Sequence, residues 1–85
     1  MKVELLYFAG LREAVGCARE ALELPADVVT AGALREHLRA RGGAWTDALA
    51  EGRTLRVAVD QAMAAADTPL RDGAEVAFFP PVTGG

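Results

Sequence analysis

The chain has 85 residues, a formal net charge of −3 and a hydrophobic share of 52%. This length suits one domain with a modest core, and this composition predicts a chain that folds. The acidic balance argues against nucleic acid or an anionic membrane as a partner, and a single cysteine excludes an internal disulfide, which fits a reducing cytoplasm.

Two strands are predicted in the first third of the chain. Residues 2–8 alternate in the manner of a strand, and Lys2 and Glu4 interrupt any apolar run, so we expect no signal peptide. A short helical segment at 11–15 lies between two glycines, and residues 18–24 alternate again. Two consecutive strands with a short connection predict an antiparallel pair. No stretch of the sequence reaches transmembrane length.

One main helix is predicted at residues 31–41. Thr30 is a suitable N-cap, because its hydroxyl can accept a hydrogen bond from a free backbone N–H of the first turn. Leu34 and Leu38 form the apolar stripe of this helix. The pair Gly42-Gly43 then predicts where the helix stops.

The second half of the chain predicts further strands. A shorter helical piece covers 45–50, and a strand follows at 54–59. We expect a loop with weak strand character at 61–70. After a turn at Asp72-Gly73, residues 74–79 alternate as the last strand.

This order of elements predicts an α+β fold. A mixed sheet with one main helix packed across one face accounts for it, in the β-grasp or ubiquitin-like layout. In that layout the first and last strands run parallel and adjacent in the centre of the sheet. We expect a β-grasp domain over residues 1–79 and an extended C-terminal Gly-Gly tail over 80–85.

One main helix can cover only one face of the predicted sheet, and the other face is more apolar than a solvent-exposed face should be. The face under the helix should form the core from Val3, Leu5, Tyr7, Leu22, Leu24, Val57, Val59, Val76 and Phe78. The other face should meet water and be polar. It carries instead Leu6, Phe8, Ala58, Ala77 and Phe79.

Two phenylalanines of the outer face predict a protein interface. With parallel central strands, Phe8 and Phe79 lie at the end of the sheet from which the tail departs. An apolar patch there is typical of a docking surface for a partner. Met63, on the loop after the predicted strand at 54–59, extends this patch. The alternative is a scatter of single exposed apolar residues, which is normal on protein surfaces.

The last six residues have the properties of a threading tail. Gly84 and Gly85 lack a Cβ and form the narrowest possible peptide, and Pro80 and Pro81 stiffen the approach. At about 3.3 Å per residue, the six residues reach roughly 20 Å, enough to carry a carboxylate into a partner's pocket. The alternative is a frayed terminus, which most domains have.

The other reactive residues do not assemble into a catalytic set. Cys17 is a candidate nucleophile, but nothing near it in sequence would lower its pKa. His37 flanks the helix stripe, and Asp60 and Asp67 are candidate carboxylates that we interpret as turn residues. We expect no metal site and no phosphate loop. The distinctive chemical group is therefore the carboxylate of Gly85.

A terminal carboxylate becomes reactive after adenylation. Joined to AMP at the expense of ATP, it forms a mixed anhydride that sulfur or nitrogen nucleophiles attack. Activated sulfur would give a thiocarboxylate, which can deliver sulfur to a substrate. A lysine amine would give an isopeptide conjugate instead.

Several short runs match one known family. They are Tyr7-Phe8-Ala9, Leu11-Arg12-Glu13, Val59-Asp60-Gln61, Pro69-Leu70, Asp72-Gly73 and, above all, the run from Glu75 to Gly85. On these runs the chain resembles the molybdopterin synthase small-subunit family, sulfur carriers of the β-grasp superfamily. Thiazole-pathway carriers also end in Gly-Gly but are less similar before it. Asp60 is a departure, because relatives often carry Asn there.

The resemblance implies a sulfur carrier in molybdenum cofactor biosynthesis. An E1-like adenylating enzyme would use ATP to activate Gly85, and a sulfur-transfer protein would supply the sulfur. The carrier, with no permanently bound cofactor, would thread Pro80, Pro81, Val82, Thr83 and Gly84 into the large synthase subunit, in a heterotetramer of two small and two large subunits. Sulfur would pass to cyclic pyranopterin monophosphate to build the dithiolene of molybdopterin.

The resemblance also implies where partners bind and who performs the chemistry. Interface positions fall on Phe8, Met63 and Phe79, with Leu6 beside them, and the catalytic residues belong to the large subunit. Two alternatives stay open. One is a carrier or modifier for another pathway, such as thiazole synthesis, tRNA thiolation or protein conjugation. The other is a non-covalent interaction domain with an inert tail.

Overall fold

The structure is a computed structural model that describes residues 1–50 and 52–81. Its elements follow one another as a strand, a short helix, a strand, two helices and three strands. Their bounds are β1 Lys2–Tyr7, α1 Ala9–Val15, β2 Arg19–Glu23, α2 Ala31–Arg39, α3 Ala44–Ala48, β3 Arg56–Val59, β4 Ala62–Ala64 and β5 Glu75–Phe79.

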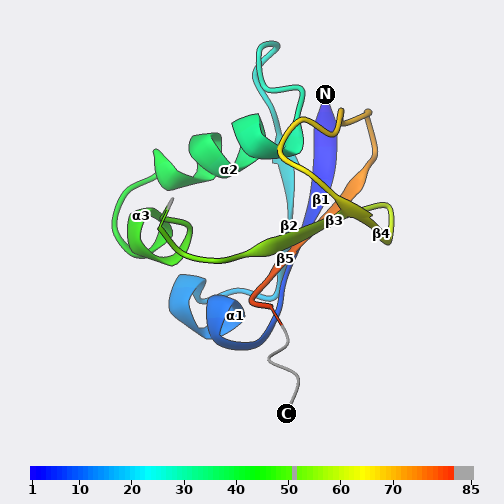
Figure 1. The fold of residues 1–85 in the computed structure, drawn as a ribbon. Helices are drawn as coiled ribbons and strands as arrows, with labels where there is room; N and C mark the ends of the chain where they lie inside the picture. The colour runs from blue at the N-terminus through cyan, green and yellow to red at the C-terminus, as the bar shows by residue number, and fades with distance from the viewer. Residues whose placement is uncertain (51, 82–85) are drawn as a thin grey trace.

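The strands form one mixed sheet in the order β2-β1-β5-β3-β4. β1 and β5 pair in parallel at its centre, and the other three pairings are antiparallel. The helices lie on one side of this sheet, and β1 and β5 both run toward the end where α1 sits and the chain departs (Figure 1). The predicted α+β, β-grasp layout is confirmed.

The core lies between the helices and the covered face of the sheet. Leu34 and Leu38 of α2 are fully buried against it, as the predicted stripe requires. Leu22, Val57 and Val59 are only half-buried, because β2 and β3 flank the central pair and the helices cover them less. The other predicted core residues, Val3, Leu5, Tyr7, Leu24, Val76 and Phe78, are buried.

The segment after β3, predicted as a loop with weak strand character, contains a strand. Residues 62–64 form a short edge strand, β4, that pairs antiparallel with β3. Asp60 and Gln61 make the turn between them with φ values of 51° and 69°. Such left-handed turns usually contain glycine, so Asp60-Gln61 is only a weak signal for a hairpin.

Several predicted boundaries were also wrong. α2 ends at Arg39 rather than at residue 41, and β1 ends at Tyr7 rather than at residue 8. Phe8 is the N-cap of α1, and Ala9 has a φ of 54°. This left-handed residue turns the chain sharply away from the sheet, which is why the strand stops before Phe8.

Candidate docking surface at the root of the tail

Two aromatic rings meet at the end of the central strands. The rings of Phe8 and Phe79 pack edge to face with centroids 6.4 Å apart. Phe8 is 47% exposed, although a side chain of this size usually seeks burial. The structure therefore brings together the two phenylalanines that alternation predicted at this place.

The next row of the outer face is apolar across four strands. The strand register sets Leu6 beside Ala77, Ala77 beside Ala58, and Ala58 beside Met63. Ala77 is only 8% exposed, whereas Met63 at the sheet edge is 61% exposed. Met63 thus joins the patch through strand β4, a connection that the predicted loop did not contain.

Charged residues frame this apolar row. Arg19 beside Leu6 forms an ion pair with Glu4 at 2.6 Å. Arg56 is paired with Phe79 in the register and has no ion-pair partner among the described residues. Its free cation at the root of the tail suits a carboxylate on a partner, and alternation of apolar residues gave no signal for it.

The described part of the tail continues the patch. Pro80 joins Phe8, Ala9 and Phe79 around a shallow, almost wholly apolar hollow of about 370 Å³. Pro80 and Pro81 are half-buried. The other predicted tail residues, Val82, Thr83, Gly84 and Gly85, lie outside the described residues. We call the surface formed by Leu6, Phe8, Ala58, Met63, Ala77, Phe79 and Pro80 the docking surface.

Cys17 is half-buried against the hydrophobic core, in a cluster with Tyr7, Glu20 and Arg41. Partial burial raises the pKa of its thiol, and the carboxylate of Glu20 raises that pKa further. A nucleophilic cysteine needs the opposite shift, because the thiolate is the reactive form. The environment of Cys17 therefore favours the neutral, inert thiol.

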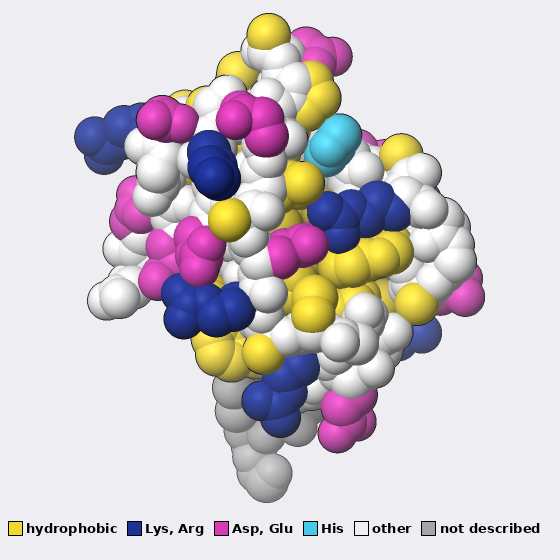
Figure 2. Space-filling view, turned by 180° about the vertical axis from the view of Figure 1, so that it is seen from behind, with side chains coloured by type: hydrophobic (Ala, Val, Ile, Leu, Met, Phe, Trp, Pro, Cys, Tyr) yellow, Lys and Arg dark blue, Asp and Glu magenta, His cyan; other side chains and the backbone are white. Residues whose placement is uncertain are grey.

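The same cluster has a structural purpose. The Tyr7 hydroxyl donates a hydrogen bond to Glu20 at 3.1 Å, and Arg41 forms an ion pair with Glu20 at 2.7 Å. The Arg41 guanidinium also lies 4.4 Å from the centroid of the Trp45 ring. Figure 2 shows the molecule from behind; below the histidine, coloured cyan, a basic side chain lies over a hydrophobic area. These contacts fasten β2 to the helical layer.

The remaining candidate residues, Asp60, Asp67 and His37, lie in turns or on the main helix. Asp60 accepts a hydrogen bond from the backbone N–H of Glu75 at 3.0 Å, which stabilises the turn before β4. Asp67 is exposed in a turn, and His37 is half-buried on α2. Within residues 1–50 and 52–81, no group of three or more His, Cys, Asp or Glu side chains could hold a metal ion. No helix in the described part is long and apolar enough to cross a membrane.

Known proteins resemble this chain over nearly its full length. A sequence model of the ThiS family matches residues 5–85. The molybdopterin synthase sulfur carrier subunit of Escherichia coli is 49% identical over 83 residues, covering 98% of this chain and 99% of the relative. The protein of the same name from Haemophilus influenzae is 43% identical, with the same coverage.

Solved structures share the fold. A putative molybdopterin converting factor subunit 1 from Pyrococcus furiosus superposes with a TM-score of 0.80 at 29% identity, covering 96% of this chain and 99% of that one. SAMP1 from Haloferax volcanii has a TM-score of 0.76 at 26% identity, with 100% of both chains covered. The chain belongs to the ThiS family and is most alike, among these proteins, to the molybdopterin synthase sulfur carrier subunits.

Proposed function

We propose that this protein is the sulfur carrier of a molybdopterin synthase and acts in molybdenum cofactor biosynthesis. The observation that carries the proposal is the 49% identity, over almost the whole of both chains, to a relative of that name. The docking surface supports it independently, because a carrier must be held by a partner at the root of its tail. Phe8 and Phe79 provide an exposed apolar anchor there.

The reacting group in this proposal is the carboxylate of Gly85. Its oxygen attacks the α-phosphate of ATP on an E1-like enzyme, pyrophosphate leaves, and an acyl-adenylate remains. The outer sulfur of a persulfide on a sulfur-transfer protein then displaces AMP and forms an acyl disulfide. A thiol cleaves the S–S bond of that acyl disulfide, so the Gly85 thiocarboxylate is released while the thiol and the carrier sulfur are oxidised to a disulfide. ATP is a substrate of the activating enzyme, so the carrier itself needs no resident cofactor.

Sulfur delivery takes place on the large synthase subunit. The thiocarboxylate sulfur attacks a side-chain carbon of cyclic pyranopterin monophosphate, a C–O bond at that carbon breaks, and a thioester joins the carrier to the pterin. Hydrolysis of that thioester returns the Gly85 carboxylate and leaves the sulfur on the pterin. Two rounds supply the two dithiolene sulfurs of molybdopterin, which suits a heterotetramer of two small and two large subunits. A cytoplasmic location is part of the proposal, since the thiocarboxylate and the free Cys17 thiol both suit a reducing compartment.

The docking surface explains why the tail needs a folded domain behind it. Binding through Phe8 and Phe79 would fix the point at which the tail leaves the sheet. Pro80 and Pro81 restrict the backbone at that point, which lowers the entropy lost when the tail enters a pocket. Gly84 and Gly85 would let the pocket close around the backbone.

Intact mass spectrometry of protein isolated from its native cell tests the carrier role. We expect a sulfur-for-oxygen exchange that fragmentation confines to Gly85. The thiocarboxylated protein, mixed with the large subunit and the pyranopterin precursor, should yield a dithiolene product. Deletion of Gly85 should abolish that product while the thermal unfolding midpoint stays unchanged. An unmodified terminus under sulfur-replete conditions would refute the carrier role, and no product from verified thiocarboxylate would refute the pathway.

Phe79→Arg tests the docking surface separately. It places an unpaired charge in the apolar contact, so affinity for the large subunit should fall by at least about tenfold. Phe79→Leu keeps an apolar side chain and serves as the matched control. Equal affinities of the two variants would show that the surface is misassigned.

A further inference from the structure

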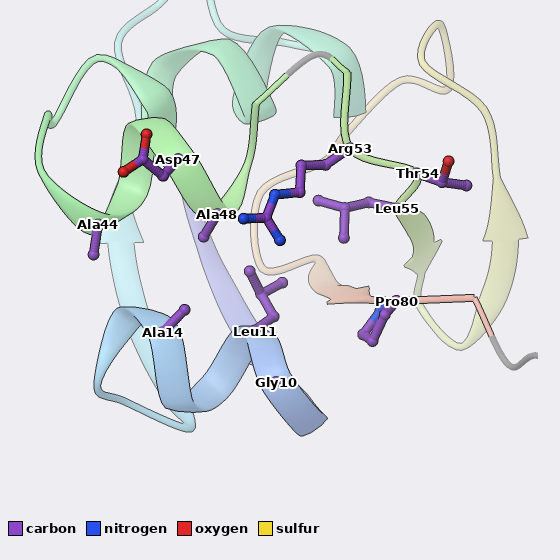
Figure 3. Close-up of a pocket in the computed structure, with 10 residues that line it drawn as sticks. All are labelled: Gly10, Leu11, Ala14, Ala44, Asp47, Ala48, Arg53, Thr54, Leu55 and Pro80. Atoms are coloured by element: carbon purple, nitrogen blue, oxygen red, sulfur yellow. The ribbon is translucent and has the colours of Figure 1, made fainter.

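A second apolar groove adjoins the root of the tail. It has a volume of about 400 Å³ and lies between α1, α3 and the segment before β3 (Figure 3). Glycine or alanine occupies four of its lining positions, so the chain's own side chains leave the space open. These positions are Gly10, Ala14, Ala44 and Ala48.

The floor and mouth of the groove differ in character. Leu11 and Ala48 are buried and form an apolar floor. The side chain of Arg53 points into the groove from above, whereas that of Asp47 points away from it (Figure 3). Arg53 makes no side-chain ion pair with the described residues. A ligand of this groove should therefore combine an apolar group with a negative charge.

The groove is continuous with the docking surface. Pro80 lines both the groove and the hollow formed with Phe8 and Phe79. A protein that encloses the tail from its root must therefore pass over Pro80 and reach the edge of both surfaces. The segment that leaves β1 also contributes to both, through Ala9 on the hollow and Gly10 on the groove.

The size of a stable subunit contact gives a further reason to extend the interface. A standard interface buries about 800 Å² on each partner, against a total accessible surface of 4996 Å² for this chain. The docking surface is a narrow strip that includes two alanines, one of them, Ala77, already buried. The groove is the adjoining apolar surface, because Pro80 lines both, and a contact of standard size that surrounds Pro80 would cover part of it.

We propose that the groove is a second contact site for the large synthase subunit, which inserts an apolar side chain between α1 and α3 and pairs a carboxylate with Arg53. This inference rests on the proposed function and adds a contact on a different surface. The large subunit would then hold the carrier on both sides of Pro80 while the tail reacts.

Affinity for the purified large subunit tests the proposal. Arg53→Glu should raise Kd at least about tenfold, with an effect that shrinks at high salt, because the pair is electrostatic. Ala14→Leu should also raise Kd by filling the groove, while the exposed position leaves the fold intact. Lys2→Glu is the matched control, since it makes the same charge change at the end of the sheet away from the tail.

The possible outcomes distinguish failure of the groove contact from failure of the sulfur-carrier function. Wild-type affinity of both Arg53→Glu and Ala14→Leu, with Phe79→Arg still weakened, would overturn the groove contact and leave the carrier function standing. Equal weakening by Lys2→Glu and Arg53→Glu would overturn it too, since net charge alone would explain the loss. Loss of binding only to the adenylating enzyme would assign the groove to that protein instead.

Discussion

Arg35 is the residue whose removal should most damage the fold near the groove. From α2 its Nε donates to the Leu49 carbonyl at 2.9 Å, and its Nη2 donates to the carbonyls of Ala50 and Arg53 at 2.5 and 2.9 Å. These bonds tie the main helix to the segment between α3 and β3. Leu49 itself is fully buried, so this segment cannot drift outward without exposing core.

Arg35→Ala should therefore lower the free energy of unfolding by about 2–4 kcal/mol. The estimate takes three charge-assisted bonds at about 1 kcal/mol or slightly more each, because they are only partly buried. A domain of this size has a total stability of roughly 4–13 kcal/mol. The unfolding midpoint should consequently fall by roughly 8–32 °C.

Urea unfolding followed by the fluorescence of Trp45 is a suitable assay, since it is the single tryptophan and packs against Tyr7. Arg35→Lys should recover less than half of the loss, because one ammonium group cannot reproduce the planar fork. Arg12→Ala is the control: its exposed side chain in α1 makes no hydrogen bond within the described residues, so the change should stay within about 0.5 kcal/mol. An Arg35→Ala variant as stable as the parent would refute the reasoning.

Three further predictions concern Tyr7, Cys17 and Gly32, which lie in the core or pack against neighbouring backbone. Burial and the carboxylate of Glu20 raise the pKa of Tyr7 above its ordinary 10.0, so the contribution of Tyr7 to the free energy of unfolding should be fully present below pH 10 and be lost as the pH rises above it. Tyr7→Phe should lower the free energy of unfolding by about 1 kcal/mol at neutral pH and should reduce its decrease above pH 10; an unchanged decrease would contradict this. Native Cys17 should react with iodoacetamide more slowly at pH 8 than the urea-unfolded chain, and equal rates would contradict its raised pKa. Gly32→Ala should cost about 1–3 kcal/mol, because the new Cβ would lie 2.9 Å from the Ala66 carbonyl oxygen; an unshifted melting midpoint would contradict it.

Alternation and stop signals were sufficient for the layers and the central pairing. Leu34 and Leu38 marked the helix face, and the period of two separated Leu5 and Tyr7 from Leu6. These patterns depend on local geometry and on which face is covered, so they can be predicted from a single sequence. They also put Phe8 and Phe79 at one end of the sheet, where the structure brings their rings together.

Tertiary geometry determined what the sequence left out. β4 follows a left-handed turn at Asp60 and Gln61, which uses neither glycine nor asparagine. The groove forms where two short helices approach each other and Pro80, and no periodic pattern reports such an approach. Arg53 belongs to neither a helix nor a strand, so its place beside α1 depends on the path that Arg35 fixes for its segment.

The parallel central pair explains why one short segment serves both proposed contacts. Because β1 and β5 run in the same direction, the residues after β1 must lie beside the residues after β5, which begin the tail. Ala9, with its φ of 54°, divides that segment. Before the division Phe8 faces the docking surface with Phe79, and after it α1 supplies Gly10 to the groove. A partner that encloses the tail thus meets the docking surface and the groove together as a direct consequence of strand direction, because Pro80, the first residue of the tail, lines both.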